Sequence, residues 1–111
     1  MLDNKTMQRF ENALPMGFGA LRELARSLAD EGLSHVAICH IFDLFGTYLR
    51  EVGRDGEAGY IWVCVENIFG WRSQESWWFG RRLTMDEVLE YRKAIGYPPR
   101  PIGEFWIGER Q

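Results

Sequence analysis

The sequence has little of what marks membrane, exported or disordered proteins. It has no apolar run near the ~18 residues that a membrane-spanning helix needs, and its first residues lack the apolar core of a signal peptide. Only two of the 111 residues are cysteines. Cys39 and Cys64 both lie in apolar stretches, which favours buried, reduced thiols over a disulfide. With 46% hydrophobic residues, a disordered chain is excluded. We expect one cytoplasmic domain, residues 1–111, that is not a membrane protein.

The sequence also lacks an excess of positive charge and a metal-binding motif. Thirteen basic and 16 acidic residues give a net charge of −3, so a nucleic-acid partner is not expected. His35 and His40 lie five residues apart in one expected helix, about 140° apart around its axis, and cannot share a metal ion there. Neither paired zinc-type cysteines nor a His-Glu-x-x-His motif is present. We expect no metal and no cofactor.

The spacing of apolar residues predicts an all-α fold. Five segments repeat apolar side chains at intervals of three and four residues, and a glycine or proline follows each. They are residues 3–14, 18–31, 34–52, 58–69 and 85–95. The third is the longest and has apolar residues on more than one side, which is typical of a central helix. We expect a compact bundle of four or five helices, with a loop at 53–56 and an extended C-terminal tail to Gln111.

Two local features leave room for interpretation. Tyr60–Val65 is rich in β-branched and aromatic residues, so a minor β element there is an alternative to a helix. We favour the helix, because a lone strand needs a partner and the best candidate, residues 105–107, is short. Gly46 lies inside the third expected helix, where glycine costs about 1 kcal/mol relative to alanine. We interpret it as a point of close helix packing.

No group of residues forms a convincing catalytic site. Cys39 and His40 are neighbours on a helix and diverge by about 100°. His40 and Asp43 are close enough to pair, but no nucleophile shares their face. Glu66 has no companion carboxylate for acid–base chemistry. Residues 17–19, Gly-Phe-Gly, match neither the P-loop nor the dinucleotide motif. We therefore expect a protein that is not an enzyme.

The most informative stretch is the aromatic run at residues 77–79, which is followed by two arginines. Three consecutive rings cannot all point inward in a regular conformation, so at least one should be exposed. Tryptophan and arginine dominate the binding energy of many protein–protein interfaces. We predict a partner-binding site at Trp77, Trp78, Phe79, Arg81 and Arg82. The alternative is that the rings cover the end of the bundle and stack on arginine stems.

The leading hypothesis is therefore a non-enzymatic regulatory protein that binds another protein through this surface. Sixteen aromatic residues in so small a chain also make a homodimer a reasonable expectation. An alternative is a small-molecule-binding helical domain. Its interhelical pocket would be lined by Phe45, Tyr48 and Trp62, with His40 or Glu66 as the polar group.

Nucleic-acid binding is a third, less favoured class. Residues 24–41 can be written as a helix-turn-helix unit, but the second helix begins with Ser34, His35 and Val36 rather than with base-reading side chains. Single strands could stack on the aromatic run, where only Arg72, Arg81 and Arg82 would hold the phosphates.

Overall fold

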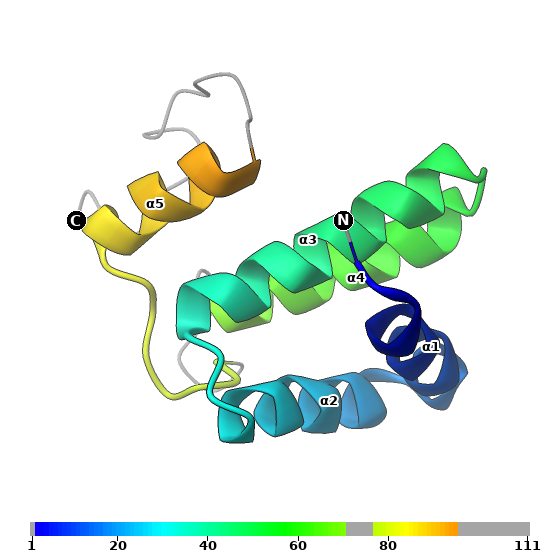
Figure 1. The fold of residues 1–111 in the computed structure, drawn as a ribbon, viewed down its shortest axis with the longest axis horizontal. Helices are drawn as coiled ribbons and strands as arrows, with labels where there is room; N and C mark the ends of the chain where they lie inside the picture. Colours follow the sequence, from blue (N-terminus) through cyan, green and yellow to red (C-terminus); the bar gives the residue numbers. More distant parts are fainter. Residues whose placement is uncertain (1, 71–76, 96–111) are drawn as a thin grey trace.

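The computed structural model describes residues 2–70 and 77–95. These residues form five α-helices and contain no strand (Figure 1). The elements are α1 (Asn4–Ala13), the 3-10 turn η1 (Leu14–Met16), α2 (Phe18–Asp30), α3 (His35–Glu51), α4 (Asp55–Phe69) and α5 (Met85–Ile95). The all-α prediction is confirmed, whereas the predicted C-terminal tail lies outside the described residues. None of the helices in residues 2–70 and 77–95 combines the length and the apolarity needed to cross a membrane.

Two helices begin at the caps that the sequence indicates. The Ser34 hydroxyl accepts a hydrogen bond of 3.1 Å from the backbone N–H of Ala37 at the start of α3. At the start of α5, the Thr84 hydroxyl accepts from the Glu87 N–H at 3.2 Å, and the Glu87 carboxylate accepts from the Thr84 N–H at 2.9 Å. The capping box therefore forms in both directions and fixes where α5 starts.

The start of α4 differs from the predicted loop. The helix already begins at Asp55, and Gly56 lies in its first turn. Two acidic residues, Asp55 and Glu57, occupy that turn, where negative charge interacts favourably with the helix dipole. Arg54 also holds the Glu57 carboxylate through hydrogen bonds of 2.6 and 3.0 Å. The strand alternative for residues 60–65 is wrong, because these residues are helical and satisfy their backbone groups within α4.

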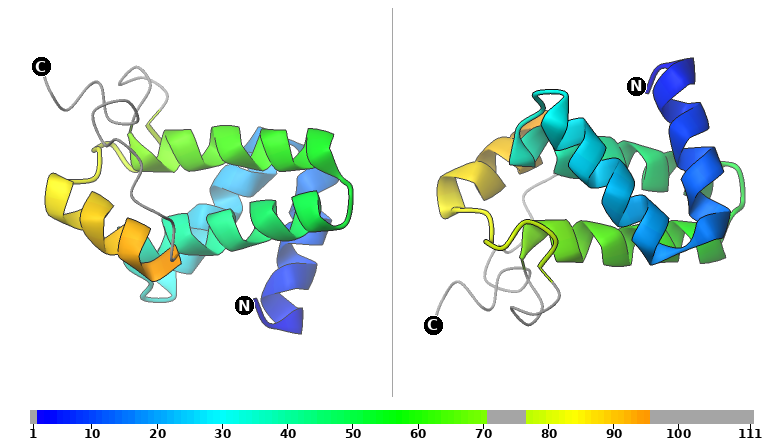
Figure 2. Two further views of the ribbon diagram at one scale, coloured as in Figure 1. Left: turned by 90° about the horizontal axis from the view of Figure 1, so that it is seen from above. Right: turned by 90° about the horizontal axis from the view of Figure 1, so that it is seen from below.

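The longest helix lies at the centre of the fold, as expected. Helices α3 and α4 run antiparallel side by side, α5 packs on α3, and α1 and α2 cover the pair from another side (Figure 2). Phe10 of α1 joins these layers, because its ring contacts Phe42 edge-on at 4.8 Å and stacks on Phe45 at 4.6 Å between centroids. All three rings are fully buried.

Helices α3 and α4 pack closely at Gly46. A Cβ atom on Gly46 would lie 3.1 Å from two carbons of the Trp62 ring, which is tighter than ordinary van der Waals contact. The interpretation of Gly46 as a point of close packing is confirmed. Because Gly46 of α3 has no side chain, the Trp62 indole of α4 can lie directly against it.

A buried polar pair connects α5 to α3. The Tyr91 hydroxyl donates a 3.1 Å hydrogen bond to the Asp43 carboxylate, and both residues are buried. The Tyr91 ring also contacts Phe69 of α4 edge-on, with 5.2 Å between centroids. One side chain of α5 thus contacts both central helices.

Candidate functional site

The predicted aromatic run is attached to the C-terminal end of α4. The last carbonyl groups of a helix have no partner inside the helix. Trp78 donates its backbone N–H to the Asn67 carbonyl at 3.1 Å, and Leu83 donates to the Phe69 carbonyl at 2.9 Å. These two bonds hold residues 78 and 83 against the end of α4, so the segment between them has a fixed base.

His35 satisfies the carbonyl between these two. Its ring nitrogen Nε2 hydrogen-bonds the Ile68 carbonyl, and because a carbonyl only accepts, Nε2 carries the proton. Burial lowers the pKa of His35 below its ordinary value, which favours the neutral ring. The Phe79 ring contacts the His35 ring, with 4.9 Å between their centroids. His35 therefore supports one of the predicted site residues.

The five predicted site residues are not equally exposed. Trp78 is only 7% exposed and packs edge-on against Phe42 at 6.0 Å. This exposure is too small for a partner-binding side chain, so we assign Trp78 to the core. The physical reason is that α4 needs its end covered, and the middle ring of the run turns inward to do so.

The flanking arginines also have internal contacts. The guanidinium carbon of Arg82 lies 5.4 Å from the centre of the half-buried Trp77 ring, within the range of a cation–π contact. Arg81 donates hydrogen bonds of 2.8 and 2.9 Å to the Glu87 carboxylate. These contacts match the alternative interpretation, in which rings and arginine stems cover the end of the bundle. Phe79 is half-buried and faces helix α2.

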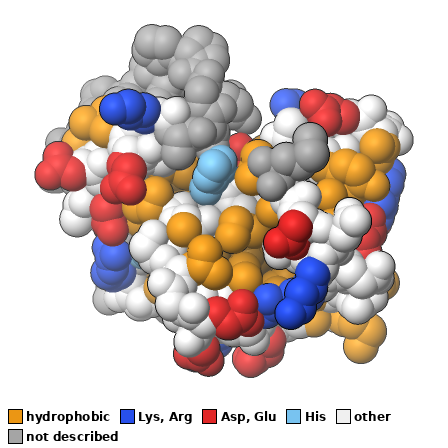
Figure 3. Space-filling model, in the orientation of Figure 1, with side chains coloured by type: hydrophobic (Ala, Val, Ile, Leu, Met, Phe, Trp, Pro, Cys, Tyr) orange, Lys and Arg blue, Asp and Glu red, His pale blue; other side chains and the backbone are white. Residues whose placement is uncertain are grey.

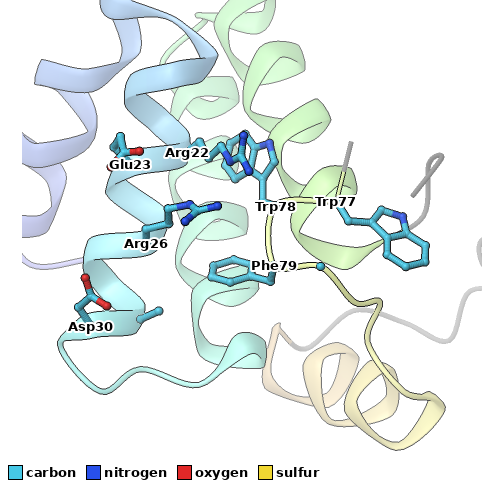
Figure 4. Close-up of a pocket in the computed structure, with 9 residues that line it drawn as sticks. Arg22, Glu23, Arg26, Asp30, Trp77, Trp78 and Phe79 are labelled. Carbon is cyan, nitrogen blue, oxygen red and sulfur yellow. The ribbon is translucent and has the colours of Figure 1, made fainter. Parts of the chain in front are cut away.

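An open cavity of about 690 Å³ lies between Phe79 and helix α2. We call this cavity the groove. One side is formed by Trp77, Trp78, Phe79 and Gly80, and the other by Arg22, Glu23, Arg26, Ala29 and Asp30 of α2. Figure 4 shows Trp78 and Phe79 directed toward α2, whereas the Trp77 indole points away from it. The volume falls within the ~300–1,000 Å³ typical of ligand-binding clefts.

Helix α2 presents its charges to the groove in two rows. Arg22 and Arg26 are four residues apart, so they lie on the same side of the helix, and both point toward the Trp78–Phe79 segment (Figure 4). Glu23 and Asp30 leave the helix on the other side in this view. The groove therefore has a basic row beside the rings and an acidic row farther out.

The two groove arginines differ from Arg9, Arg54 and Arg81, which pair with carboxylates. Arg9, Arg54 and Arg81 each donate at least two hydrogen bonds to carboxylates. Neither Arg22 nor Arg26 has a hydrogen bond or an ion pair in the part of the chain that the structure describes. Both side chains are exposed. Their donors are available to a ligand.

The sequence analysis missed the contribution of α2. A signal existed, because Arg22 and Arg26 repeat at a helical interval opposite the buried stripe of Leu21, Leu24 and Leu28. Nothing in the sequence showed that this row lies beside residues 77–80, more than 50 positions later.

The predicted interhelical pocket is filled by its own side chains. Phe45 is fully buried and stacks on Phe10 and Tyr48, while the Trp62 indole lies against Gly46. The proposed polar groups, His40 and Glu66, are each half-buried. The structure uses these aromatic residues for packing between helices.

In the helix-turn-helix interpretation, the first turn of α3 would have to be exposed. Val36, in the first turn of α3, is buried, and the His35 ring contacts the end of α4. A recognition helix needs this turn free to enter a groove of DNA. Of the arginines named for single-strand binding, Arg72 lies outside the described residues.

The two cysteines, of which Cys39 was weighed as a nucleophile, are buried thiols. Cys39 and Cys64 are free and buried, as the sequence suggested. Burial raises the pKa of the Cys64 thiol to about 12 and raises that of Cys39 further, so both stay protonated at neutral pH. Within residues 2–70 and 77–95, no three His, Cys, Asp or Glu side chains are grouped so that they could hold a metal ion.

Comparison of this chain with known protein families, with curated proteins and with solved structures finds no match. The functional interpretation therefore depends on the side chains of the groove.

Proposed function

We propose that this protein is a non-enzymatic, regulatory binding protein that holds a segment of another protein in the groove between α2 and residues 77–80. One observation carries the proposal. Two guanidinium groups without partners among the described residues lie opposite a half-buried phenylalanine in a cavity of about 690 Å³. Aromatic and arginine side chains are enriched among the residues that dominate binding energy at protein interfaces.

The rigidity of the aromatic side supports binding. Trp78 is held by its backbone bond to Asn67 and by its buried ring, and Phe79 rests on the His35 ring. A surface that is already ordered loses little conformational entropy when a partner arrives. The groove therefore has the fixed apolar side that an anchoring side chain needs.

The charges of the groove favour a protein over a nucleic acid. Glu23 and Asp30 line the same cavity as Arg22 and Arg26, so its formal charge is zero. A phosphodiester backbone carries a charge at every nucleotide, so it would meet the two carboxylates as well as the two guanidiniums, and the chain as a whole carries a net charge of −3. A protein segment can present both signs of charge to the two rows.

A cytoplasmic location and self-association remain predictions. Apolar side chains also gather at the centre of the face in Figure 3, with charged side chains around them. Four large apolar residues are exposed in the described part of the chain: Met16, Phe18, Val52 and Leu89. Sedimentation over a range of concentrations will show whether the chain forms a dimer.

Selection of peptides on the immobilised full-length chain tests the proposed function. Twelve-residue peptides displayed on phage are selected, sequenced, synthesised and measured by fluorescence polarisation. We expect them to lose at least tenfold in affinity for Phe79→Ser, because this change removes the anchoring surface. Val52→Ser is the control, since it also replaces an apolar side chain by serine, at the far end of α3 and away from the residues that line the groove. Peptides that bind Phe79→Ser as tightly as the unchanged protein, or a selection that yields no binder, would refute the proposal.

A further inference from the structure

The chemistry of the groove points to the kind of segment it binds, provided that the proposed function holds. Arg22 and Arg26 are one helical turn apart, about 6 Å along the axis of α2. At this spacing their guanidiniums can hold one carboxylate between them or two carboxylates side by side. Arginine forms paired, charge-assisted hydrogen bonds with carboxylates, which are among the strongest in proteins.

Two other arginines, which hold the fold together, are paired with carboxylates. Arg9 joins α1 to Glu31 at 2.7 Å, and Arg54 joins Glu11 at 2.8 Å. Carboxylate pairing is thus how this protein uses its arginines when they hold the fold together. Arg22 and Arg26 are more exposed than Arg9 and Arg54 and have no carboxylate partner among the described residues. An acidic side chain of a partner would supply the carboxylate that Arg22 and Arg26 lack.

The apolar part of the site lies next to these donors. The Phe79 ring faces the cavity and is supported from behind by His35, at 4.9 Å between ring centroids. Ala29 lines the opposite side and adds only a methyl group. Phe79 and Ala29 thus provide apolar lining on both sides of the groove, beside the arginine row.

We infer that the groove binds an acidic segment of a partner protein, with one apolar side chain packed on Phe79 and a neighbouring carboxylate held by Arg22 and Arg26. The acidic row of Glu23 and Asp30 then faces the solvent edge of the bound segment. A basic residue on that edge strengthens binding, and an acidic one weakens it.

A set of four labelled peptides of equal length tests the inference. The reference peptide has a central phenylalanine flanked by glutamates. The other three replace the glutamates by glutamine, replace them by lysine, or replace the phenylalanine by serine. We expect the reference peptide to bind at least tenfold more tightly than each of the others at about 0.1 M salt, and to weaken at higher salt. Equal affinity for the glutamate and glutamine peptides would overturn the inference.

Charge reversal on the protein provides the complementary test. Arg26→Glu should lower the affinity for the glutamate peptide at least tenfold and raise that for the lysine peptide. Arg50→Glu, at the exposed end of α3, makes the same change in net charge away from the groove and should alter neither. Both positions are exposed, and thermal unfolding confirms that each variant is folded. Equal effects of the two substitutions would refute direct recognition of the carboxylate.

The result separates the inference from the proposed function. Selected peptides that depend on Phe79 but bind Arg26→Glu normally would refute the acidic segment and leave the groove as a protein-binding site. Selected peptides whose affinity depends on neither Phe79 nor Arg26 would refute both the acidic segment and the proposed function. Tighter binding of single-stranded oligothymidine than of the glutamate peptide would assign the groove to nucleic acid. A concentration-dependent dimer that Arg26→Glu abolishes would assign it to a second copy of this chain; either outcome overturns the inference.

Discussion

The backbone of Arg82 crosses directly against Gly70. A Cβ atom on Gly70 would lie 2.3 Å from the Arg82 Cα, and the φ angle of Gly70 is +87°. Only glycine combines this conformation with this approach. The glycine that ends α4 therefore also determines where the aromatic segment passes, and with it one side of the groove.

Gly70→Ala should destabilise the protein by about 2–4 kcal/mol, because it adds both backbone strain and a collision with a neighbouring backbone. Gly53→Ala is the matched control, since Gly53 has a φ angle of +82° but no atom within 4 Å of an added Cβ. It should lose only about 1–2 kcal/mol from the left-handed conformation. Urea unfolding measures both, and equal losses would contradict the close approach of Arg82.

Two helical glycines should respond to alanine with opposite signs. Gly46→Ala pushes a methyl group against the Trp62 ring, 3.1 Å away, and we expect a net loss of about 1–2 kcal/mol from overpacking. Gly59→Ala in α4 meets nothing within 4 Å and should gain about 0.5–1 kcal/mol from helix propensity. Thermal unfolding gives both values. A stabilised Gly46→Ala variant would mean that α3 and α4 pack more loosely than described.

Stability should fall as the solution becomes mildly acidic. Burial lowers the pKa of His35 from its ordinary 6.5, so the unfolded chain binds a proton before the folded chain does. The Nδ1 atom that would receive this proton is buried and has no hydrogen-bond partner. Of the nearby charges, Arg81 lowers this pKa further and Glu87 opposes it. The free energy of unfolding should therefore decrease below pH 6.5, by at most about 1.4 kcal/mol per pH unit for one proton.

His35→Gln should flatten this decrease between pH 6.5 and 5, as measured by urea unfolding at each pH. His40→Gln is the comparison, because burial also lowers the pKa of His40, but among the described residues only the His35 ring has a buried nitrogen without a hydrogen-bond partner, so His40→Gln should flatten the decrease less. An equal change in slope for the two variants would show that His35 has no special role.

A second acid-induced loss should follow at lower pH. The Arg81 guanidinium lowers the pKa of Glu87 from 4.5 to about 2, with help from the N–H of Thr84. This contribution to stability is complete above pH 4.5 and is lost as the pH falls toward 2. Glu87→Gln should reduce the dependence in this range without abolishing it, because the pKa values of Asp3, Glu31 and Glu57 are also lowered by their hydrogen bonds. An unchanged acid transition would contradict the pairing of Arg81 with Glu87.

Tyr91→Phe should lower the free energy of unfolding by about 1–2 kcal/mol, because a buried carboxylate of Asp43 loses a hydrogen-bond donor. Tyr48→Phe removes a hydroxyl that has no hydrogen bond within the described residues and should change stability by less than about 0.5 kcal/mol. Similar effects of the two substitutions, measured by chemical unfolding, would mean that the Tyr91 hydroxyl does not fix α5 to α3.

Local rules predicted most of the helix boundaries. The caps at Ser34 and Thr84 and the glycine stops depend on a few neighbouring residues, so they can be read from the sequence. The start of α4 was placed too late, because glycine at position 56 resembled a loop while the acidic first turn at Asp55 was overlooked. The choice between helix and strand for residues 60–65 was correct for a physical reason, the missing strand partner.

The site was harder to predict because it depends on contacts between distant segments. Composition singled out the aromatic run, but not which ring turns inward: Trp78 enters the core and Phe79 faces the groove. The backbone there is fixed by the hydrogen bond of the Trp78 N–H to the Asn67 carbonyl, a contact between segments that no local pattern shows. The pairing of this run with Arg22 and Arg26 likewise arises only when the chain folds.

The most direct test of the groove as a binding site is NMR mapping on the ¹⁵N-labelled full-length chain with a peptide from the display selection. We expect the largest backbone shift changes at Arg22, Arg26, Phe79 and Gly80, and a loss of these changes in Phe79→Ser but not in Val52→Ser. Changes centred on Met16 and Phe18, or spread evenly over the five helices, would contradict binding in the groove.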